Sequence, residues 1–265
     1  MKNLILKVIR LFFRLFLKLL SKKTDTTHLG TPYGGWDFIE DHKLKNTTII
    51  SAGAGEDISF DIEFIEKYNS TVIIVDPTPR AIEHVSQVKT LLGEKKSKEY
   101  DLETGYQDPK SYNLESITVE QIILIEKALT NSENEIVSFY PPQNPSHVSH
   151  SISNYQNNFI KTDNFIEVTT TTVSEIIKEY NIKHIELIKL DIEGAENQVL
   201  PHLLFSKILP NQILVEFDEL VINSFKPYFQ CMTILIRFLF NGYWIVHTNS
   251  FPNFLIVKKS LLKNF

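Results

Sequence analysis

The chain has 265 residues, of which 43% are hydrophobic, and this is enough to bury the core of one large α/β domain. Its formal net charge of −5 excludes the basic surplus that contact with a phosphate backbone requires, so we expect no nucleic-acid partner. The single cysteine, Cys231, cannot form an internal disulfide, and the composition predicts a reducing, cytoplasmic setting.

The first 23 residues carry seven Lys or Arg side chains and no Asp or Glu. Over residues 4–20, cations recur every three or four positions within a run of Leu, Ile, Val and Phe, which predicts an amphipathic helix with one cationic face. These cations are Lys7, Arg10, Arg14 and Lys18. No apolar run is long enough to span a bilayer. We expect residues 1–23 either to lie on an anionic membrane, at its inner face, or to pack on the domain or on a second copy of the chain in a homo-oligomer.

Residues 24–46 are interpreted as a linker and lead-in, and residues 47–265 as one domain in which short apolar strands alternate with helical patterns. Strands are predicted at 47–51, 71–75, 120–129, 135–140, 185–190, 212–217, 243–247 and 254–257. Helices are predicted at 58–68, 80–92, 173–180 and 195–205, and an irregular segment at 94–116. The alternation predicts a Rossmann-like α/β fold with a mostly parallel, seven-stranded sheet and helices on both faces.

A glycine turn follows the first of these strands. It consists of Gly53, Ala54, Gly55 and Glu56. Glycine lets backbone amides come close to a ligand because it has no Cβ. Asp76 ends the next strand, just before Pro77, where an acidic side chain can accept both hydroxyls of a ribose. The turn and the acid together predict a nucleoside ligand, without separating S-adenosylmethionine from a dinucleotide.

Asp57 bears on the choice of cofactor, because it occupies the position of a third glycine in this turn. An acidic residue there would repel a pyrophosphate placed at the helix N-terminus. S-adenosyl-L-methionine instead carries an ammonium and a sulfonium group, which tolerate carboxylates. The sequence therefore favours S-adenosyl-L-methionine.

Four separated segments resemble the FkbM family of S-adenosylmethionine-dependent methyltransferases. They are SAGAGEDISFD at 51–61, VDPTPR at 75–80, FYPPQNPSHVSHS at 139–151 and LIKLDIEGAE at 187–196, and the last is the most specific. The resemblance covers residues 33–217 and implies a class I methyltransferase fold and methyl transfer to oxygen, often on sugars or natural products. It also implies cofactor contacts at Gly53, Gly55, Asp76 and the strand end near Glu126.

Methyl transfer to a hydroxyl needs an aligned acceptor and a group that removes its proton. Asp191 and Glu193 follow the strand at 185–190, at the edge where open α/β sheets bind ligands, and Lys189 would point the same way. Asp191 is a candidate base, with cofactor anchoring and helix capping as alternatives. Glu193 can equally stabilise the start of the helix that follows it.

His147 and His150 lie in a polar loop and compete with Asp191 for the role of base, although loop histidines are often surface residues. Glu216, at the end of a later strand, could complete a carboxylate cluster with Asp191, together with Asp218 and Glu219 just after it. Such a cluster would suit Mg²⁺. Because sequence cannot show that these groups meet in space, we assign no metal ligand.

The leading hypothesis is an S-adenosylmethionine-dependent O-methyltransferase acting on a hydroxyl of a glycan, glycolipid or natural product. An NAD-type Rossmann oxidoreductase is an alternative, disfavoured by Asp57 and because no Tyr-x-x-x-Lys pair lies in a predicted helix. A catalytically inactive binding module with a methyltransferase fold is another. The candidate groups at Asp76, Asp191 and Glu193 argue against that reading.

Overall fold

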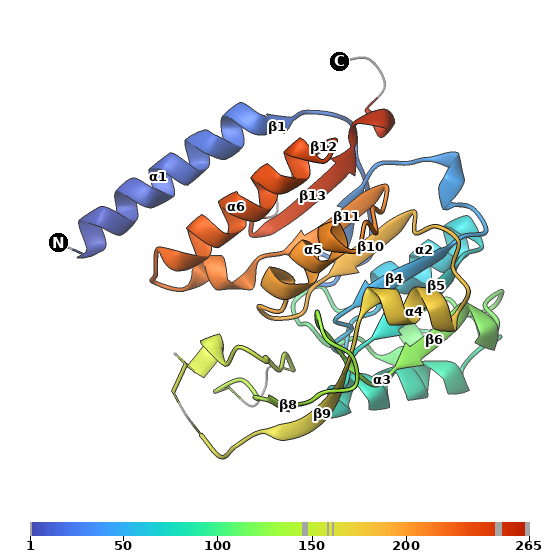
Figure 1. The fold of residues 1–265 in the computed structure, drawn as a ribbon. Coiled ribbons are helices and arrows are strands. Elements are labelled where there is room, and N and C mark those ends of the chain that lie inside the picture. Colours follow the sequence, from blue (N-terminus) through green and yellow to red (C-terminus); the bar gives the residue numbers. More distant parts are fainter. Residues whose placement is uncertain (1, 145–147, 158, 161, 247–250, 263–265) are drawn as a thin grey trace.

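The computed structural model describes residues 2–144, 148–157, 159–160, 162–246 and 251–262. The helices are α1 (Lys2–Leu20), α2 (Ser59–Tyr68), α3 (Pro79–Thr90), α4 (Val173–Glu179), α5 (Glu196–Phe205) and α6 (Lys226–Phe240). The strands are β1 (Ser21–Lys22), β2 (Thr27–Leu29), β3 (Trp36–Phe38), β4 (Thr48–Ala52), β5 (Thr71–Val75), β6 (Ile122–Ile125), β7 (Ala128–Leu129), β8 (Ile136–Phe139), β9 (Ile166–Thr171), β10 (Leu187–Leu190), β11 (Gln212–Glu216), β12 (Tyr243–Val246) and β13 (Asn253–Lys258). Figure 1 shows their arrangement.

The main sheet has eight strands in the order β1-β12-β13-β11-β10-β4-β5-β6. The predicted α/β class is confirmed, but the sheet is mixed and has eight strands rather than seven. Strand β13 runs antiparallel to both β11 and β12, and the short β1 adds an edge strand parallel to β12. The connection between β12 and β13 is too short for a crossover, which takes about a dozen residues or more, so these two strands must be antiparallel.

Both faces of the sheet are buried, which explains why its central strands are almost wholly apolar. Successive residues point to opposite faces, so Ile50 and Ile188 belong to one core cluster, and Ile49 and Leu187 to another. Helices α1, α4, α5 and α6 contribute to the first cluster, and α2 and α3 to the second. The helices on both faces thereby hold the strands in place, and the loops at the carboxyl ends of the strands can form a ligand site.

Helix α1 confirms the predicted helix and packs one of its faces on the domain. Phe13 is 1% exposed and lies edge-on to Tyr228 of α6, with ring centroids 5.3 Å apart. Arg10 Nε donates a hydrogen bond to the Tyr228 hydroxyl at 3.0 Å. Of the two expected placements of this helix, the structure therefore shows packing on the chain's own domain.

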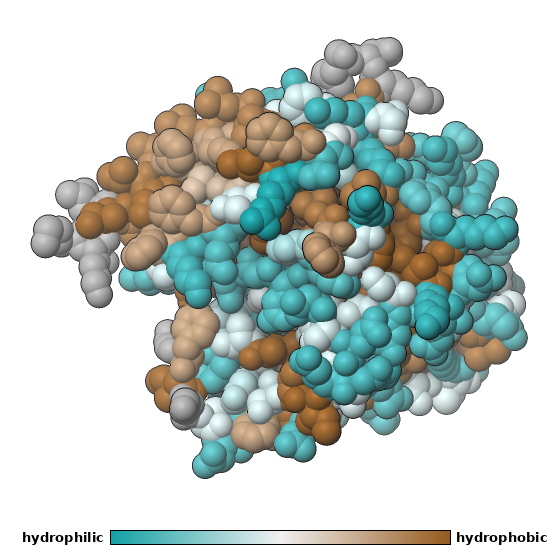
Figure 2. All heavy atoms as spheres, viewed as in Figure 1, coloured by the Kyte–Doolittle hydropathy of each residue, from teal (hydrophilic) through white to brown (hydrophobic). Residues whose placement is uncertain are grey.

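A second apolar face of α1 remains on the surface. It consists of Ile5, Val8, Leu11, Phe12, Leu15 and Leu19. Figure 2 shows apolar side chains gathered over α1 and α6. Among the described residues, no helix is long and apolar enough to cross a membrane.

Two segments differ from their predicted structure. The expected linker contains the hairpin β2–β3, which buries Trp36 and Phe38 against the core. The strand predicted at 120–129 is divided, because β6 pairs with β5 whereas β7 pairs with β9 in a separate sheet of order β7-β9-β8. The charged Glu126 and Lys127 stand between the two apolar parts, at the point where the chain leaves the main sheet.

Candidate active site

A cavity of about 760 Å³ lies at the carboxyl ends of β4, β5, β10 and β11. We call it the acidic cavity because seven carboxyl groups line it. Its volume is typical of small-molecule sites, and its position is the edge of an open α/β sheet where ligands bind. Residues of the loop 148–157 and the segment 32–34 also line it.

The glycine turn forms one wall of this cavity. Gly53 has φ +84° and Gly55 has φ +54°, so both adopt the left-handed conformation that glycine tolerates best. A Cβ on Gly53 would lie 1.7 Å from the carbonyl oxygen of Asp191, whereas a Cβ on Gly55 would meet nothing within 4 Å. Gly53 therefore permits the close approach of β4 to β10, and Gly55 keeps the cavity open.

Asp76 holds the glycine turn in place. Its Oδ2 accepts hydrogen bonds from Ala54 N at 2.8 Å and Gly55 N at 3.2 Å, and its Oδ1 accepts one from Thr78 N at 2.8 Å. Asp76 and Pro77 both line the acidic cavity. The carboxylate thus has a structural role in the turn that the sequence did not indicate.

Glu56 and Asp57 are tied to neighbouring segments. Glu56 forms an ion pair with Arg80 of α3. Asp57 is buried and accepts hydrogen bonds from Ser59 N at 2.9 Å and from the Thr31 hydroxyl at 2.5 Å. Since both acids also line the acidic cavity, they contribute negative charge to it from fixed positions.

The turn after β10 is shaped by Glu196, a residue that sequence reasoning did not select. Glu196 is 1% exposed, and its carboxylate accepts hydrogen bonds from Ile192 N and Gly194 N, both at 2.8 Å. Glu193 has φ +54°, and its side chain does not accept these two hydrogen bonds. Glu196 therefore satisfies the backbone at the start of α5, and Glu193 faces the cavity instead.

The loop 148–157 fixes the side chain of Glu193. Its Oε2 accepts hydrogen bonds from the Tyr155 hydroxyl and from Gln156 Nε2, the latter at 2.8 Å. Ser151 Oγ donates to the Glu193 carbonyl at 2.7 Å. Tyr155 and Gln156 follow the resembling segment that ends at Ser151, and no pattern in their own sequence marks them. Their role depends on a contact between segments far apart in the chain.

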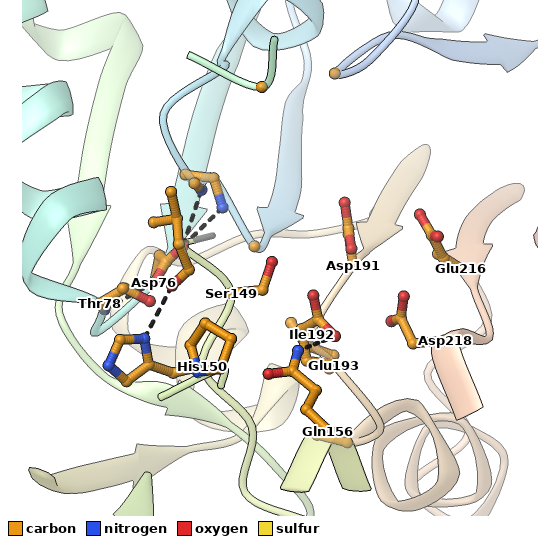
Figure 3. Close-up of a pocket in the computed structure, with 18 of the residues that line it drawn as sticks. Asp76, Thr78, Ser149, His150, Gln156, Asp191, Ile192, Glu193, Glu216 and Asp218 are labelled. Atoms are coloured by element: carbon orange, nitrogen blue, oxygen red, sulfur yellow. Dashed lines mark hydrogen bonds between the residues drawn. The ribbon is translucent and has the colours of Figure 1, made fainter. Parts of the chain in front are cut away.

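A carboxylate cluster forms where β10 and β11 end. Carboxylate oxygens of Asp191, Glu193 and Asp218 all lie within 4.8 Å of one another, and Figure 3 shows Glu216 beside them. Oδ2 of Asp218 is buried and has no hydrogen-bond partner among the described residues. The meeting of Asp191 with the acids after β11, which the sequence left open, is thus present in the fold.

Burial and mutual repulsion change the protonation of this cluster. Burial raises the pKa of Asp191 to about 6, with Glu193 and Asp76 adding to the rise and Lys189 opposing it. Burial, followed by the charges of Asp191 and Glu193, raises the pKa of Glu216 to about 8. The pKa of Asp218 is also raised well above its usual value by burial. Near neutral pH the cluster therefore shares protons, with Asp191 the more readily ionised of the first two.

Lys189 lies behind the glycine turn. Its side chain is buried, its ammonium donates a hydrogen bond to the Gly53 carbonyl, and it lies 5.9 Å from the ring centroid of Trp36. Lys189 lines the acidic cavity, but its ammonium group donates this hydrogen bond to the backbone. Lys189 therefore braces the turn and offsets part of the negative charge around it.

Of the predicted site residues His147, His150 and Glu126, only His150 is among the described residues that line the cavity. His150 lines the cavity, stacks on Phe139 with centroids 5.4 Å apart, and has Nδ1 2.9 Å from the Val148 carbonyl. Figure 3 shows it beside Asp76 and Thr78, on the side away from the carboxylate cluster. His147 lies outside the described residues. Glu126 is exposed after β6 and is not among the residues that line the cavity.

Carboxyl groups outnumber cationic groups in the described lining of the cavity. Seven carboxyl groups line it, against one ammonium group among the described lining residues, that of Lys189. The acids are Glu56, Asp57, Asp76, Asp191, Glu193, Glu216 and Asp218. One corner is apolar and is formed by Ala128, Leu129, Phe139 and Ile152. This lining suits a ligand that combines positive charge with a flat apolar part.

Comparison with known proteins agrees with this architecture. No curated protein matches the chain. The sequence does match the methyltransferase FkbM domain over residues 42–243, a span that runs from just before β4 to the start of β12 and includes the glycine turn and the carboxylate cluster. The chain therefore belongs to the FkbM methyltransferase family.

Proposed function

We propose that the protein uses S-adenosyl-L-methionine to methylate a hydroxyl oxygen, on an acceptor of the glycan, glycolipid or natural-product type. The observation that carries the proposal is a single cavity in which an open glycine turn faces a cluster of carboxyl groups with raised pKa values. The turn would bind the cofactor, and the cluster would serve the acceptor.

The residues present fit S-adenosylmethionine on charge. Its ammonium and sulfonium groups would be stabilised by the ionised members of the seven carboxyl groups, whereas the pyrophosphate of a dinucleotide would be repelled by them. Gly53, Gly55 and Asp76 would hold the nucleoside and methionine parts, and the corner around Phe139 would accept the adenine. When bound, the cofactor supplies an electrophilic methyl group next to the cluster.

Asp191 is the group best suited to remove the acceptor's proton. With a pKa raised to about 6 it is mostly ionised at neutral pH yet basic enough to take up a proton, which is the balance that general base catalysis requires. Asp191 would take the hydroxyl proton, and the oxygen would bond to the methyl group as the bond from that group to the cofactor's sulfur breaks and the sulfur keeps the electron pair. Glu193, held by Tyr155 and Gln156, and the proton-bearing Glu216 would orient the hydroxyl.

His150 is a weaker candidate for this role. Its ring lies beside Asp76 rather than the carboxylate cluster, so we propose that it contacts the cofactor side of the site. His150→Ala is then expected to weaken S-adenosylmethionine binding. A loss of turnover with unchanged binding would instead assign it to the acceptor.

Calorimetric titration with S-adenosylmethionine and with NAD tests the proposal before any acceptor is known. We expect S-adenosylmethionine to bind and NAD to show no heat of binding. Binding of NAD alone would replace the methyltransferase hypothesis with that of an oxidoreductase.

The cluster also has the composition of a divalent-cation site. Three carboxylates within 4.8 Å of one another and the unpartnered Asp218 oxygen favour this second role, in which Mg²⁺ would lower the pKa of the acceptor hydroxyl. Titration of the protein with Mg²⁺ alone, followed calorimetrically with Asp218→Asn as the control, tests it. Equal heats for both proteins would remove the cation from the proposal.

We further propose that the exposed apolar face of α1 lies on an anionic membrane surface. Phe12 and Leu19 are 60% and 82% exposed, and the cations Arg14 and Lys18 border this face. Burial of the apolar side chains in the interface and attraction of the cations to anionic headgroups would act together.

A further inference from the structure

A second cavity, of about 750 Å³, lies between α1 and the ends of β12 and β13. We call it the basic cavity. Its apolar lining comes from α1, α6 and the sheet, and includes Phe13, Leu17, Tyr228, Ile245 and Phe254. Its cations are Arg10, Arg14, Lys18 and Lys23, and no carboxylate residue is among its described lining residues. It therefore combines an apolar interior with a positively charged rim.

Three of the four cations are placed by the helix that carries them, and Lys23 follows β1. Arg10, Arg14 and Lys18 follow one another at intervals of four, which places them on one face of α1. Arg10 is anchored by Tyr228, but Arg14, Lys18 and Lys23 are exposed, and the described part of the chain offers none of these three a carboxylate at ion-pair distance. Their charge is thus available to an anion from outside the chain.

The basic cavity adjoins the acidic cavity. Val221, Phe251 and Asn253 line both of them, so these three residues form the boundary between the two spaces. Cations therefore line one side of this boundary, and carboxyl groups, of which Asp191 is mostly ionised at neutral pH, line the other. A molecule that reached across it would be oriented by charge alone, because an anionic group is attracted to one side and repelled from the other.

We propose that the basic cavity binds the methyl acceptor, and that this acceptor is an amphiphile in which a phosphate or diphosphate group joins an apolar chain to a hydroxyl-bearing part. The chain would occupy the apolar lining beside Phe13 and Phe254, and the phosphate would contact Arg14, Lys18 and Lys23. The hydroxyl-bearing part would pass Val221 and Asn253 toward Asp191. This inference rests on the proposed methyltransferase function and names the substrate class of the same site.

The location of the cavity agrees with such a substrate. The cationic face of α1 lies between the face that packs on Tyr228 and the face that exposes Leu15 and Leu19. An amphiphile held in a membrane below the exposed face would meet the cations first and the basic cavity next. The same helix would then attach the protein to the surface and receive its acceptor.

Calorimetric titration of the full-length protein with farnesyl phosphate, farnesol and inorganic phosphate tests this inference. We expect farnesyl phosphate to bind at least about tenfold more tightly than either of the other two, because only it satisfies both the apolar interior and the cations. Inorganic phosphate binding as tightly as farnesyl phosphate would show a site for free anions, and farnesol binding as tightly would show a purely apolar site. Either outcome overturns the inference.

A pair of charge-removing variants locates the binding. Arg14→Gln/Lys18→Gln should weaken farnesyl phosphate about tenfold, the scale of losing two charge-assisted contacts at a partly exposed site. Lys7→Gln/Lys183→Gln removes the same charge from positions that do not line the cavity and should change the affinity less than about twofold. Equal weakening by both variants would mean nonspecific attraction.

The same titrations separate this inference from the function on which it rests. S-adenosylmethionine affinity is measured on each protein, and we expect it to be unchanged by the Arg14 and Lys18 substitutions. If S-adenosylmethionine binds and farnesyl phosphate does not, the acceptor class is wrong and the methyltransferase proposal stands. If farnesyl phosphate binds and S-adenosylmethionine does not, the basic cavity is a site for phosphorylated amphiphiles, but its ligand is not a methyl acceptor and the methyltransferase proposal fails.

Discussion

Substitution of the two turn glycines by alanine should affect different properties: Gly53→Ala mainly the stability of the fold, and Gly55→Ala mainly the binding of the ligand. In Gly53→Ala the new Cβ would start 1.7 Å from the Asp191 carbonyl oxygen, and real Cβ atoms stay at least 3.0 Å away, so β4 and β10 would have to separate by about 1.3 Å at this end. That movement strains the hydrogen bond from Asp191 N to Ala52 O, now 3.0 Å long. In Gly55→Ala the methyl group meets nothing within 4 Å.

The expected magnitudes follow from these contacts. Both variants incur roughly 1–2 kcal/mol for a non-glycine residue in the left-handed region. Gly53→Ala adds the clash and a weakened backbone hydrogen bond, for a total loss of about 3–5 kcal/mol in the free energy of unfolding. At about 2–4 °C per kcal/mol this is a fall in Tm of roughly 6–20 °C.

Urea unfolding followed by circular dichroism measures the stability of both variants, and calorimetry measures their affinity for S-adenosylmethionine. We expect Gly55→Ala to remain folded and to lose at least about tenfold in affinity, because its methyl group adds a Cβ to the turn that lines the acidic cavity. Equal destabilisation by the two substitutions would refute the close approach of Asp191. Unchanged affinity in Gly55→Ala would refute the placement of the cofactor on this turn.

Three further predictions concern the carboxylates and the surface of α1. Asp191→Asn should lower turnover by about 10²–10⁴-fold and leave the affinity for S-adenosylmethionine nearly unchanged. Turnover of the wild-type protein should rise with pH through about 6, because the Asp191 carboxylate ionises there. A flat pH profile would exclude Asp191 as the base. Because the folded-state pKa of Glu216 is raised from 4.5 to about 8, the folded protein holds a proton that the unfolded chain releases, so stability should fall as pH rises from about 4.5 to 8. Glu216→Gln should reduce the fall in the free energy of unfolding between pH 4.5 and 8 by about 2–4 kcal/mol, as measured by urea unfolding at several pH values. An unchanged dependence on pH would mean that burial does not raise the pKa of Glu216. Leu15→Gln/Leu19→Gln should reduce co-sedimentation of the protein with vesicles of anionic phospholipid at low salt. The control Leu102→Gln alters an exposed apolar residue elsewhere and should not reduce it. Equal binding by the wild type and both variants would exclude α1 as the membrane contact.

Local patterns in the sequence were enough to predict most of the elements and the family. Strands such as 71–75 are short apolar runs closed by turn residues, and they coincide with β5 because their burial on both faces requires that composition. The glycine turn was identified for the same reason, since the conformation of Gly53 and Gly55 depends on the residues themselves. The segment that contains Asp191 and Glu193 indicated the FkbM family before any contact was known.

Contacts between distant segments were decided only by the tertiary structure. The sequence could not show that Asp76 holds the glycine turn or that Tyr155 holds Glu193, because each contact joins residues that no local periodicity relates. Nor could it show that the side chain of Glu196, rather than that of Glu193, holds the backbone of the turn before α5.

The first helix illustrates the same division. Its composition determined that it is amphipathic and cationic, since the spacing of Lys7, Arg10, Arg14 and Lys18 follows from the helical period alone. Which of its apolar side chains are buried depends on the surface that α6 and β12 present to it. Packing of Phe13 on Tyr228 sets the rotation of the helix, and that rotation places the cations over the basic cavity and leaves Leu19 on the surface.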